Sequence, residues 1–468
     1  MTVYEKSAAG RRGFIPEPCD VPAAALGAIV GEENLRKTPA ALPEMSEIDT
    51  VRHYTALAKK NFGVDTGFYP LGSCTMKYNP KINEQLASLP GFLSAHPFAP
   101  DEMNRGCLRL MAELERMLCA ICGMEAFSLQ PAAGAHGELT GLMCMAAYFA
   151  KQGQSHRNVI LIPDSAHGTN PASAAQAGFS VRAVPSGRDG LVDPATLREA
   201  AEAAGGALVG LMLTNPNTLG LFEKNIMEVA GIIHGAGGLL YYDGANLNAV
   251  MGVTSPGAMG FDVMHLNLHK TFSAPHGGGG PGAGPVGAGK LLAPFLPGGG
   301  QDSIGRVRAY RGSFGVLVRA YCYIRALGAS GLREASESAV LNANWLLNRL
   351  SGAYDAPYGE RCMHEFVLSA AAMKEQTGVS AMDIAKGLID KGFHPPTVYF
   401  PTIVPESLMT EPTETESPET LEAFAAAMLS LAEDAKRNPE ALHSAPVTTP
   451  VGRLDATAAA RQPIIKSR

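Results

Sequence analysis

The sequence has few charged residues and no long apolar run. Of its 468 residues only 18% are charged, whereas 46% are apolar. No segment reaches the roughly 18 consecutive apolar residues of a membrane-spanning helix. The first residues, MTVYEKSAAGRRGF, also lack the apolar stretch of a secretory signal peptide. We therefore expect a globular protein of the cytoplasm that has no membrane partner.

Basic charge, clustered cysteines and familiar metal motifs are lacking too. The net charge is -6, so no basic field is available for nucleic acid. The chain has eight cysteines, and the one close pair, Cys119 and Cys122, lies in a helical pattern without a second ligand pair. Neither an HExxH zinc motif nor a GxSxG nucleophile elbow is present. The sequence therefore predicts no metal site and no serine chemistry.

From about residue 127 onward, apolar segments typical of strands alternate with helical patterns. This alternation is typical of α/β domains with a mostly parallel sheet. The predicted strands are Ala126–Leu129, Val159–Ile162, Ser180–Val184, Leu208–Leu213, Leu239–Tyr242 and Val263–Leu268.

The chain divides into three predicted parts. Residues 1–100 are rich in Pro and Gly and are expected to form an arm that wraps over a neighbour. Residues 101–315 contain the predicted sheet and form the large domain. Residues 316–468 are expected to form a small C-terminal α+β domain. The predicted elements of this small domain are helices at 316–350, 381–391 and 421–436 and a strand at 364–370, with an acidic, solvated loop at 411–419.

Lys270 follows the last predicted strand and precedes a glycine-rich loop. A lysine buried there would lose hydration, which lowers its pKa and makes the amine a nucleophile. Asp243 follows a neighbouring strand, and the carboxyl ends of parallel strands meet at one sheet edge. Alone, Lys270 could be a surface lysine and Asp243 a helix cap. Together they match pyridoxal phosphate, which needs a lysine for its aldehyde and a carboxylate for its pyridine nitrogen.

Further segments place small and polar residues at the same edge. A helix is expected to begin near Gly134, and its free N–H groups can seat a phosphate. His136 in its first turn can stack on a flat cofactor, or it can be an exposed histidine beside a capping loop. Thr169 lies in the polar segment 164–174, and the segment 214–223 follows another strand in the same way. This convergence predicts a ligand site.

Six motifs together resemble the glycine decarboxylase P-protein family. They are SCTMK, QPAAGAHGE, SAHGTNPASA, TNPNTLG, DGANLNA and HLNLHKTFSAPHGGGGPG. The resemblance runs from about Gly63 to the end, and the length is similar to that of subunit 2 in the split bacterial form of the family. It implies the fold-type I pyridoxal-phosphate architecture, which is aspartate-aminotransferase-like. It also implies glycine dehydrogenase (aminomethyl-transferring) activity, in which glycine is decarboxylated and its aminomethyl group passes to the lipoyl group of the H protein in the glycine cleavage system.

The resemblance also implies roles for individual residues. Lys270 would bear the cofactor, and Asp243 would lie beneath its pyridine nitrogen. The other cofactor contacts that we expect are Ala245 and His136 on the two ring faces, Gly134, Ala135 and Thr271 around the phosphate, and Thr169 and His269. Single-chain relatives have Ser and Gln where this chain has Ala133 and His136, which leaves backbone N–H groups for the phosphate.

The partners that the resemblance implies are a homologous subunit 1, in a heterotetramer with two copies of each chain, and the lipoylated H protein as a transient partner. Two alternatives stay open. The chain could be another fold-type I enzyme, such as a cysteine desulfurase or an amino-acid decarboxylase. It could also be a scaffold subunit without cofactor.

Overall fold

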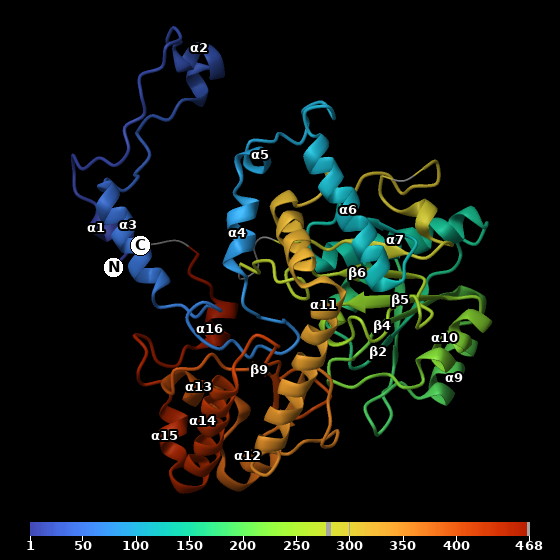
Figure 1. Ribbon diagram of the computed structural model, residues 1–468. Coiled ribbons are helices and arrows are strands. Elements are labelled where there is room, and N and C mark those ends of the chain that lie inside the picture. The colour runs from blue at the N-terminus through green and yellow to red at the C-terminus, as the bar shows by residue number, and fades with distance from the viewer. Residues whose placement is uncertain (278–281, 299, 466–468) are drawn as a thin grey trace. The chain divides into compact units, whose positions relative to one another are not determined.

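A computed structural model describes residues 1–277, 282–298 and 300–465 of the chain. Most of the predicted glycine-rich loop, residues 278–281, lies outside this range. The chain forms two compact units, residues 1–63 and 64–468, and each is described by itself (Figure 1). In the described residues no helix has the length and apolar character to cross a membrane.

The first unit, which is described in full, has almost no apolar core. Its helices are α1 (Val3–Lys6), α2 (Leu26–Val30) and α3 (Glu47–Ala58). Within residues 1–63 only Met45 and His53 are buried. Large apolar side chains such as Phe14, Ile15 and Leu42 are exposed instead. The unit therefore does not bury enough apolar surface to stabilise itself.

The second unit is built on a sheet that contains seven strands among the described residues. The strand order is β1-β7-β6-β5-β4-β2-β3. Neighbours from β6 to β3 are parallel, whereas β7 is antiparallel to both β1 and β6. The strands are β1 (Ala126–Ser128), β2 (Val159–Pro163), β3 (Ser180–Val184), β4 (Leu208–Thr214), β5 (Leu239–Gly244), β6 (Val263–Leu266) and β7 (Val286–Ala288). The mostly parallel sheet is confirmed, and β7 is a strand that the sequence did not predict.

Helices cover both faces of this sheet. Side chains alternate along each strand, so Tyr241 and Val263 pack with helix α7 (Gly134–Lys151) and its neighbour α8 (Thr169–Gln176). On the opposite face, Leu240 and Met264 pack with side chains of helices α9 and α10. The helices on this opposite face are α6 (Arg105–Cys122), α9 (Pro194–Ala204) and α10 (Ile226–Gly235). Burial on both faces explains why the central strands β4, β5 and β6 are mostly apolar.

Helix α7 lies unusually close to the strands because glycines form the face that contacts them. A Cβ atom on Gly137 would lie 2.6 Å from the carbonyl oxygen of Gly284 and 2.8 Å from Cβ of His265. A Cβ atom on Gly141 would similarly meet the ring of Tyr241. This close contact places the first turn of α7 beside the ends of β5 and β6.

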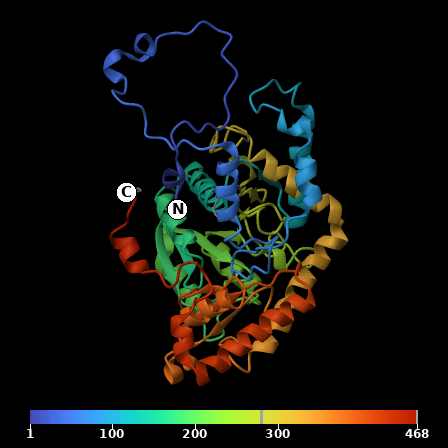
Figure 2. The same cartoon turned by 90° about the vertical axis from the view of Figure 1, so that its left-hand side faces the viewer.

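The C-terminal part packs around a second sheet with the order β8-β10-β9, whose pairs are antiparallel. Helix α11 (Phe314–Leu350) connects the two sheets and is kinked at Gly328, whose φ is 63°. Figure 2 shows the orange and red helices of this part gathered at one end of the large sheet. The strands of this part are β8 (Phe366–Ser369), β9 (Thr397–Val398) and β10 (Ser407–Thr410), and its other helices are α12 (Ala371–Thr377), α13 (Ala381–Asp390), α14 (Pro418–Arg437), α15 (Pro439–Ser444) and α16 (Ala456–Arg461). Two short helices, α4 (Lys81–Ala87) and α5 (Pro90–Leu93), precede the large sheet in the chain.

The prediction that the acidic stretch 411–419 is a solvated loop is wrong for its first half. Glu411 and Thr413 are fully buried, and the side chain of Glu414 is 9% exposed. Glu414 is neutralised by Lys77, with 2.6 Å between Oε1 and Nζ. Glu411 accepts a hydrogen bond from the backbone amide of Thr75. Partners distant in sequence therefore bury charges that composition alone assigns to solvent.

Candidate active site

Three residues in register across the sheet define the site. Thr214 at the end of β4 is the register partner of Asp243 on β5, which is in turn the partner of His265 on β6. All three are buried. A row of polar side chains at the carboxyl edge of a parallel sheet is the usual place for a ligand in this fold class.

Asp243 is held as a carboxylate by groups on every side. Its Oδ2 accepts from the side-chain amide of Asn170 at 2.9 Å, and its Oδ1 accepts from the backbone amide of Ala245 at 3.0 Å. Burial alone would raise the pKa of this carboxyl. The nearby imidazole of His265, these two hydrogen bonds and the charge of Lys270 outweigh burial and hold the pKa of Asp243 below its ordinary value.

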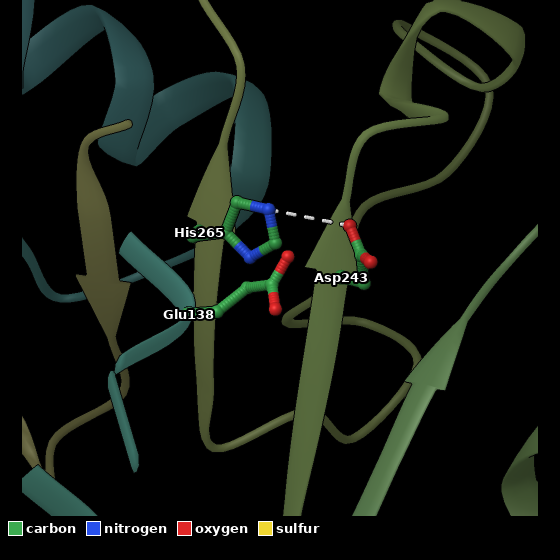
Figure 3. Close-up of side chains that lie close together, drawn as sticks. All are labelled: Glu138, Asp243 and His265. Carbon is green, nitrogen blue, oxygen red and sulfur yellow. Dashed lines mark ion pairs between the residues drawn. The ribbon is translucent and has the colours of Figure 1, made fainter. Parts of the chain in front are cut away.

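Figure 3 shows Glu138, Asp243 and His265 converging from helix α7, β5 and β6. Nε2 of His265 lies 3.3 Å from Oδ1 of Asp243, while its Nδ1 lies 3.0 Å from the hydroxyl of Tyr241. The Glu138 carboxylate accepts from the hydroxyl groups of Thr169 at 2.7 Å and Ser173 at 2.8 Å. The side chains of His265 and Glu138 next to Asp243 are thus held in place by hydrogen bonds and ion pairing.

Lys270 lies in the loop after β6 and is half-buried. Its Nζ donates a hydrogen bond to the backbone carbonyl of Ser73 at 2.8 Å. Its charge also acts on His269, whose pKa is lowered to about 3 by burial first and then by Lys270 and His276. His269 is therefore a neutral imidazole at physiological pH.

Several buried polar atoms around Lys270 and Asp243 have no hydrogen-bond partner in the described part of the chain. They are Oγ1 of Thr214, Oδ1 of Asn170, Oδ1 of Asn267, Nδ1 of His269 and Oγ1 of Thr271. Buried polar groups are nearly always paired in folded proteins. Their concentration here indicates that a polar ligand completes the site.

The first turn of α7 brings its backbone to the same place. Gly134 is buried against the side chain of Asn267, and a Cβ atom there would lie 2.7 Å from Nδ2. Ala135 is exposed, and the first N–H groups of a helix have no partner within the helix. His136 is half-buried and accepts from the amide of Ala132 at 3.1 Å. Burial first, and then the charge of Arg308, lower its pKa.

A second group of ionisable side chains comes from the C-terminal sheet. His364 and Glu365 precede β8 and Glu411 follows β10, and all three are fully buried. Nε2 of His364 lies 3.9 Å from an oxygen of each carboxylate. The charge of Lys270 acts on all three. This cluster therefore belongs to the surroundings of Lys270, although it lies about a hundred residues or more away in sequence.

The structure places the predicted residues in two groups. In the first group, Ala245 donates a hydrogen bond to Asp243 and the charge of Lys270 acts on Asp243, while Thr169 donates to Glu138, which lies beside Asp243. In the second group, Thr271 and His269 have unpartnered buried atoms and Gly134 lies close to Asn267. His136 instead accepts a hydrogen bond from Ala132, and the charge of Arg308 acts on it. The residues that the sequence reading missed are Glu138, Tyr241, His265, Asn267, His364, Glu365 and Glu411. Two of them had a detectable signal in the sequence: Glu138 lies one helical turn after Gly134, and His265 is a lone histidine within the apolar stretch 263–268.

Comparison with solved structures identifies the class of fold. The crystal structure of glycine decarboxylase (P-protein) of the glycine cleavage system in inhibitor-bound form matches with a TM-score of 0.71 and 22% identity, over 87% of this chain and 95% of that chain. Sphingosine-1-phosphate lyase from Burkholderia pseudomallei matches with a TM-score of 0.64 and 17% identity, over 89% of this chain and 96% of that chain. The fold is that of the fold-type I pyridoxal-phosphate enzymes, as the sequence predicted.

Sequence relatives identify the family. Probable glycine dehydrogenase (decarboxylating) subunit 2 from Caldanaerobacter subterraneus subsp. tengcongensis is 56% identical over 99% of this chain and 98% of its own length. The Listeria innocua protein of the same name is also 56% identical, over 99% of this chain and 97% of its own length. Residues 335–446 match the family described as "Glycine dehydrogenase, C-terminal domain". The chain belongs to the glycine dehydrogenase (decarboxylating) subunit 2 family, the P-protein of the glycine cleavage system, EC 1.4.4.2.

Proposed function

We propose that this chain binds pyridoxal phosphate through Lys270 and Asp243, decarboxylates glycine, and passes the aminomethyl group to the lipoyl group of the H protein. The observation that carries the proposal is the placement of a fixed, ionised carboxylate and a half-buried lysine at one sheet edge. Membership in the glycine dehydrogenase family favours this reaction over that of a cysteine desulfurase or another amino-acid decarboxylase, and Lys270 together with Asp243 argues against a scaffold subunit without cofactor.

The residues present fit the cofactor. A pyridine nitrogen needs an ionised carboxylate, which Asp243 supplies because its pKa is below the ordinary value. A phosphate needs uncovered N–H groups and hydroxyl groups, which the first turn of α7 and the buried, unpartnered hydroxyl of Thr271 supply. Ala245 is small and half-buried, so its methyl group leaves room for a flat ring. The unpartnered side chains around Lys270 would gain partners from such a ligand.

When bound, pyridoxal phosphate supplies an electron-accepting ring that stabilises the carbanion left by loss of CO2. The chain's own residues hold the group and fix its charge. Lys270 would hold the aldehyde carbon, and Asp243 would keep a proton on the ring nitrogen. His136 would cover one ring face and Ala245 the other. His269 is neutral, so it can accept or donate a hydrogen bond without adding a second positive charge beside Lys270.

Around these residues, a second set holds the phosphate and the carboxylate in place. Gly134, Ala135 and Thr271 would bind the phosphate. Thr169 donates a hydrogen bond to Glu138, which lies beside Asp243. This bond would hold Thr169 in a fixed position relative to Asp243. His265 and Asn170 would prevent Asp243 from turning away from the ring.

The proposed partners are a homologous subunit 1, in a heterotetramer with two copies of each chain, and the lipoylated H protein as a transient partner. The family's designation as a subunit 2 supports a subunit 1. The exposed apolar side chains of residues 1–63 support a neighbouring protein that covers them. The domain limits at residues 100 and 315 and the cytoplasmic location stay predictions from the sequence.

One experiment tests the proposed function. The purified chain is incubated with pyridoxal phosphate, with and without subunit 1, and its visible absorbance is recorded. Exchange of labelled CO2 with the glycine carboxyl group is then measured in the presence of lipoylated H protein. We expect a yellow protein and glycine-dependent exchange that requires subunit 1. A colourless protein would refute cofactor binding, and full exchange by this chain without subunit 1 would refute the proposed heterotetramer.

A further inference from the structure

The loop Ser73–Thr75 covers Lys270 in a conformation that non-glycine residues rarely adopt. Ser73 has a φ of 63° and Thr75 a φ of 42°, both in the left-handed region. The carbonyl of Ser73 accepts the hydrogen bond from Nζ of Lys270. Such a backbone persists only where the surrounding structure holds it. Contacts from outside the loop must therefore maintain the position of this carbonyl.

Two buried glutamates supply those contacts. Oε2 of Glu365 accepts from the amide of Ser73 at 2.7 Å, and Oε2 of Glu411 accepts from the amide of Thr75 at 2.9 Å. Both glutamates adjoin the paired residues Phe366 and Thr410 of the antiparallel strands β8 and β10. They are therefore cross-strand neighbours, and the backbone holds their carboxyl groups close together.

A carboxyl oxygen of Glu365 lies within 4.8 Å of one of Glu411. Two buried carboxyl groups at such a distance are not both ionised at neutral pH. Burial first, and then Glu411, raise the pKa of Glu365 well above its ordinary value. Burial raises the pKa of Glu411 to about 7, although the hydrogen bond from the Thr75 amide and the charge of Lys270 oppose this rise. Oε1 of Glu411 has no hydrogen-bond partner among the described residues.

The other ionisable groups around the pair do not neutralise it. His364 faces both carboxyl groups, but burial lowers its pKa to about 3, so it is uncharged. Glu414 is already paired with Lys77. The pKa of Cys74 in the covering loop is raised, by burial first, so it stays a thiol. Among the described residues, Lys270 is the cation whose charge acts on both Glu365 and Glu411.

We propose that Glu365 and Glu411 share one proton and that the single negative charge left on the pair is the counter-ion of Lys270. The loop Ser73–Thr75 connects the glutamate pair to Lys270, because its amides donate to the glutamates and the carbonyl of Ser73 accepts from the lysine. Asp243 serves the opposite end of the proposed cofactor. The proposal extends the proposed function, because it assigns an acid–base pair to the lysine through which the cofactor would be held.

The first test detects the shared proton in the full-length chain without cofactor. Infrared spectra are recorded at pH 7 for the wild type, Glu365→Gln/Glu411→Gln and the control Glu360→Gln, whose side chain is exposed. A glutamine oxygen can still accept from the amides of Ser73 and Thr75, so the loop keeps its contacts. We expect a protonated-carboxyl band that the double variant lacks and the control retains. An unchanged band in the double variant would overturn the shared proton.

The second test measures the effect on Lys270 itself. The chains are acylated with acetic anhydride over a range of pH, and the extent of Lys270 modification is quantified by mass spectrometry. Without the negative charge, Lys270 loses its counter-ion, so Lys270 should be acylated to a greater extent in the double variant than in the wild type under the same conditions. Equal extents of Lys270 modification in the wild type and the double variant would overturn the counter-ion role. A merely structural role of the glutamates would leave the extent of modification unchanged.

A further variant protects both tests against misfolding. If circular dichroism shows that the double variant is unfolded, the single variant Glu411→Gln replaces it, and loss of the partner must then shift or abolish the infrared band. Neither test depends on bound cofactor. A chain that passes both and stays colourless with pyridoxal phosphate would refute the proposed function and leave the acid–base pair standing.

Discussion

Asp243 and His265 are register partners on adjacent parallel strands, with 3.3 Å between Oδ1 and Nε2. The imidazole and the amide of Asn170 contact different oxygens of one buried carboxylate. The carboxylate can therefore neither rotate nor readily take up a proton. This arrangement makes Asp243 a fixed negative charge rather than a titrating group at physiological pH.

The first prediction concerns that charge. The variant Asp243→Asn keeps the size of the side chain but removes its charge, so we expect glycine-dependent CO2 exchange to fall by a factor on the order of 10² or more. Cofactor binding should weaken less, because Lys270 and the phosphate contacts remain. Exchange rates and cofactor content are measured on the same preparations. Near-normal exchange would show that another carboxylate faces the ring nitrogen.

A second prediction separates the covalent role of Lys270 from any structural role. The variant Lys270→Ala should lose the visible absorbance of the bound cofactor and all measurable turnover, while its circular dichroism spectrum stays that of the folded wild type. The matched control is Lys290→Ala, an exposed lysine beyond the same glycine-rich segment, which should retain both properties. Borohydride reduction followed by peptide mapping checks the assignment. Cofactor found on a different lysine in the wild type would contradict it.

The third prediction uses the glycine face of α7. Gly137→Ala should destabilise the fold by about 1–3 kcal/mol, because the new methyl group meets the backbone of Gly284 and Cβ of His265. The matched control is Gly231→Ala in helix α10, where no atom lies within 4 Å of the added Cβ. That control should be stabilised by roughly 0.5–1 kcal/mol, since alanine favours the helix. Denaturant unfolding measures both, and equal effects would show that α7 can move away from the sheet.

A fourth prediction concerns the buried pair Lys77 and Glu414. Lys77→Met leaves Glu414 buried without its cation and should destabilise the chain by about 3–5 kcal/mol. The double variant Lys77→Met/Glu414→Leu should be less destabilised than this single variant. Lys81→Met is the control, because its partner Asp65 is exposed and the pair contributes no more than about 1 kcal/mol. A single variant as stable as this control would contradict the prediction.

The same pair gives a pH dependence with a definite sign. For Glu414, burial opposes ionisation, but Lys77 outweighs it and lowers the pKa, so this contribution is lost as the pH falls through the lowered value. For Lys77, burial opposes the charge, but Glu414 outweighs it and raises the pKa, so its contribution is lost as the pH rises through the raised value. The contribution of the pair to wild-type stability should therefore be flat between about pH 5 and pH 10. In Lys77→Met, burial without the cation raises the pKa of Glu414, so this variant should lose stability relative to the wild type as the pH rises above about 5. Urea unfolding at several pH values tests this.

The sequence predicted the part of the site that local patterns determine. Asp243 and Lys270 follow strands whose apolar pattern is plain, and parallel strands bring their ends together. Strand β7 has only three residues, between Pro285 and Gly289, so its pattern is too short to detect. Glu365 and Glu411 could not be assigned from sequence, because their burial depends on partners 292 and 336 residues away. Composition alone places such charges in solvent.

The hydrogen bonds of Glu365 and Glu411 to the loop Ser73–Thr75 have a consequence for the order in which parts of the chain fold during synthesis. A chain emerging from the ribosome contains Ser73 and Lys270 long before Glu411 has been synthesised. Contacts across such sequence separations form late, because a long loop must close before they contribute. The covering loop can therefore adopt its strained shape only after the C-terminal sheet has folded. A nascent or truncated chain that ends before β10 would expose Lys270 without its cover, even if the large sheet were already complete.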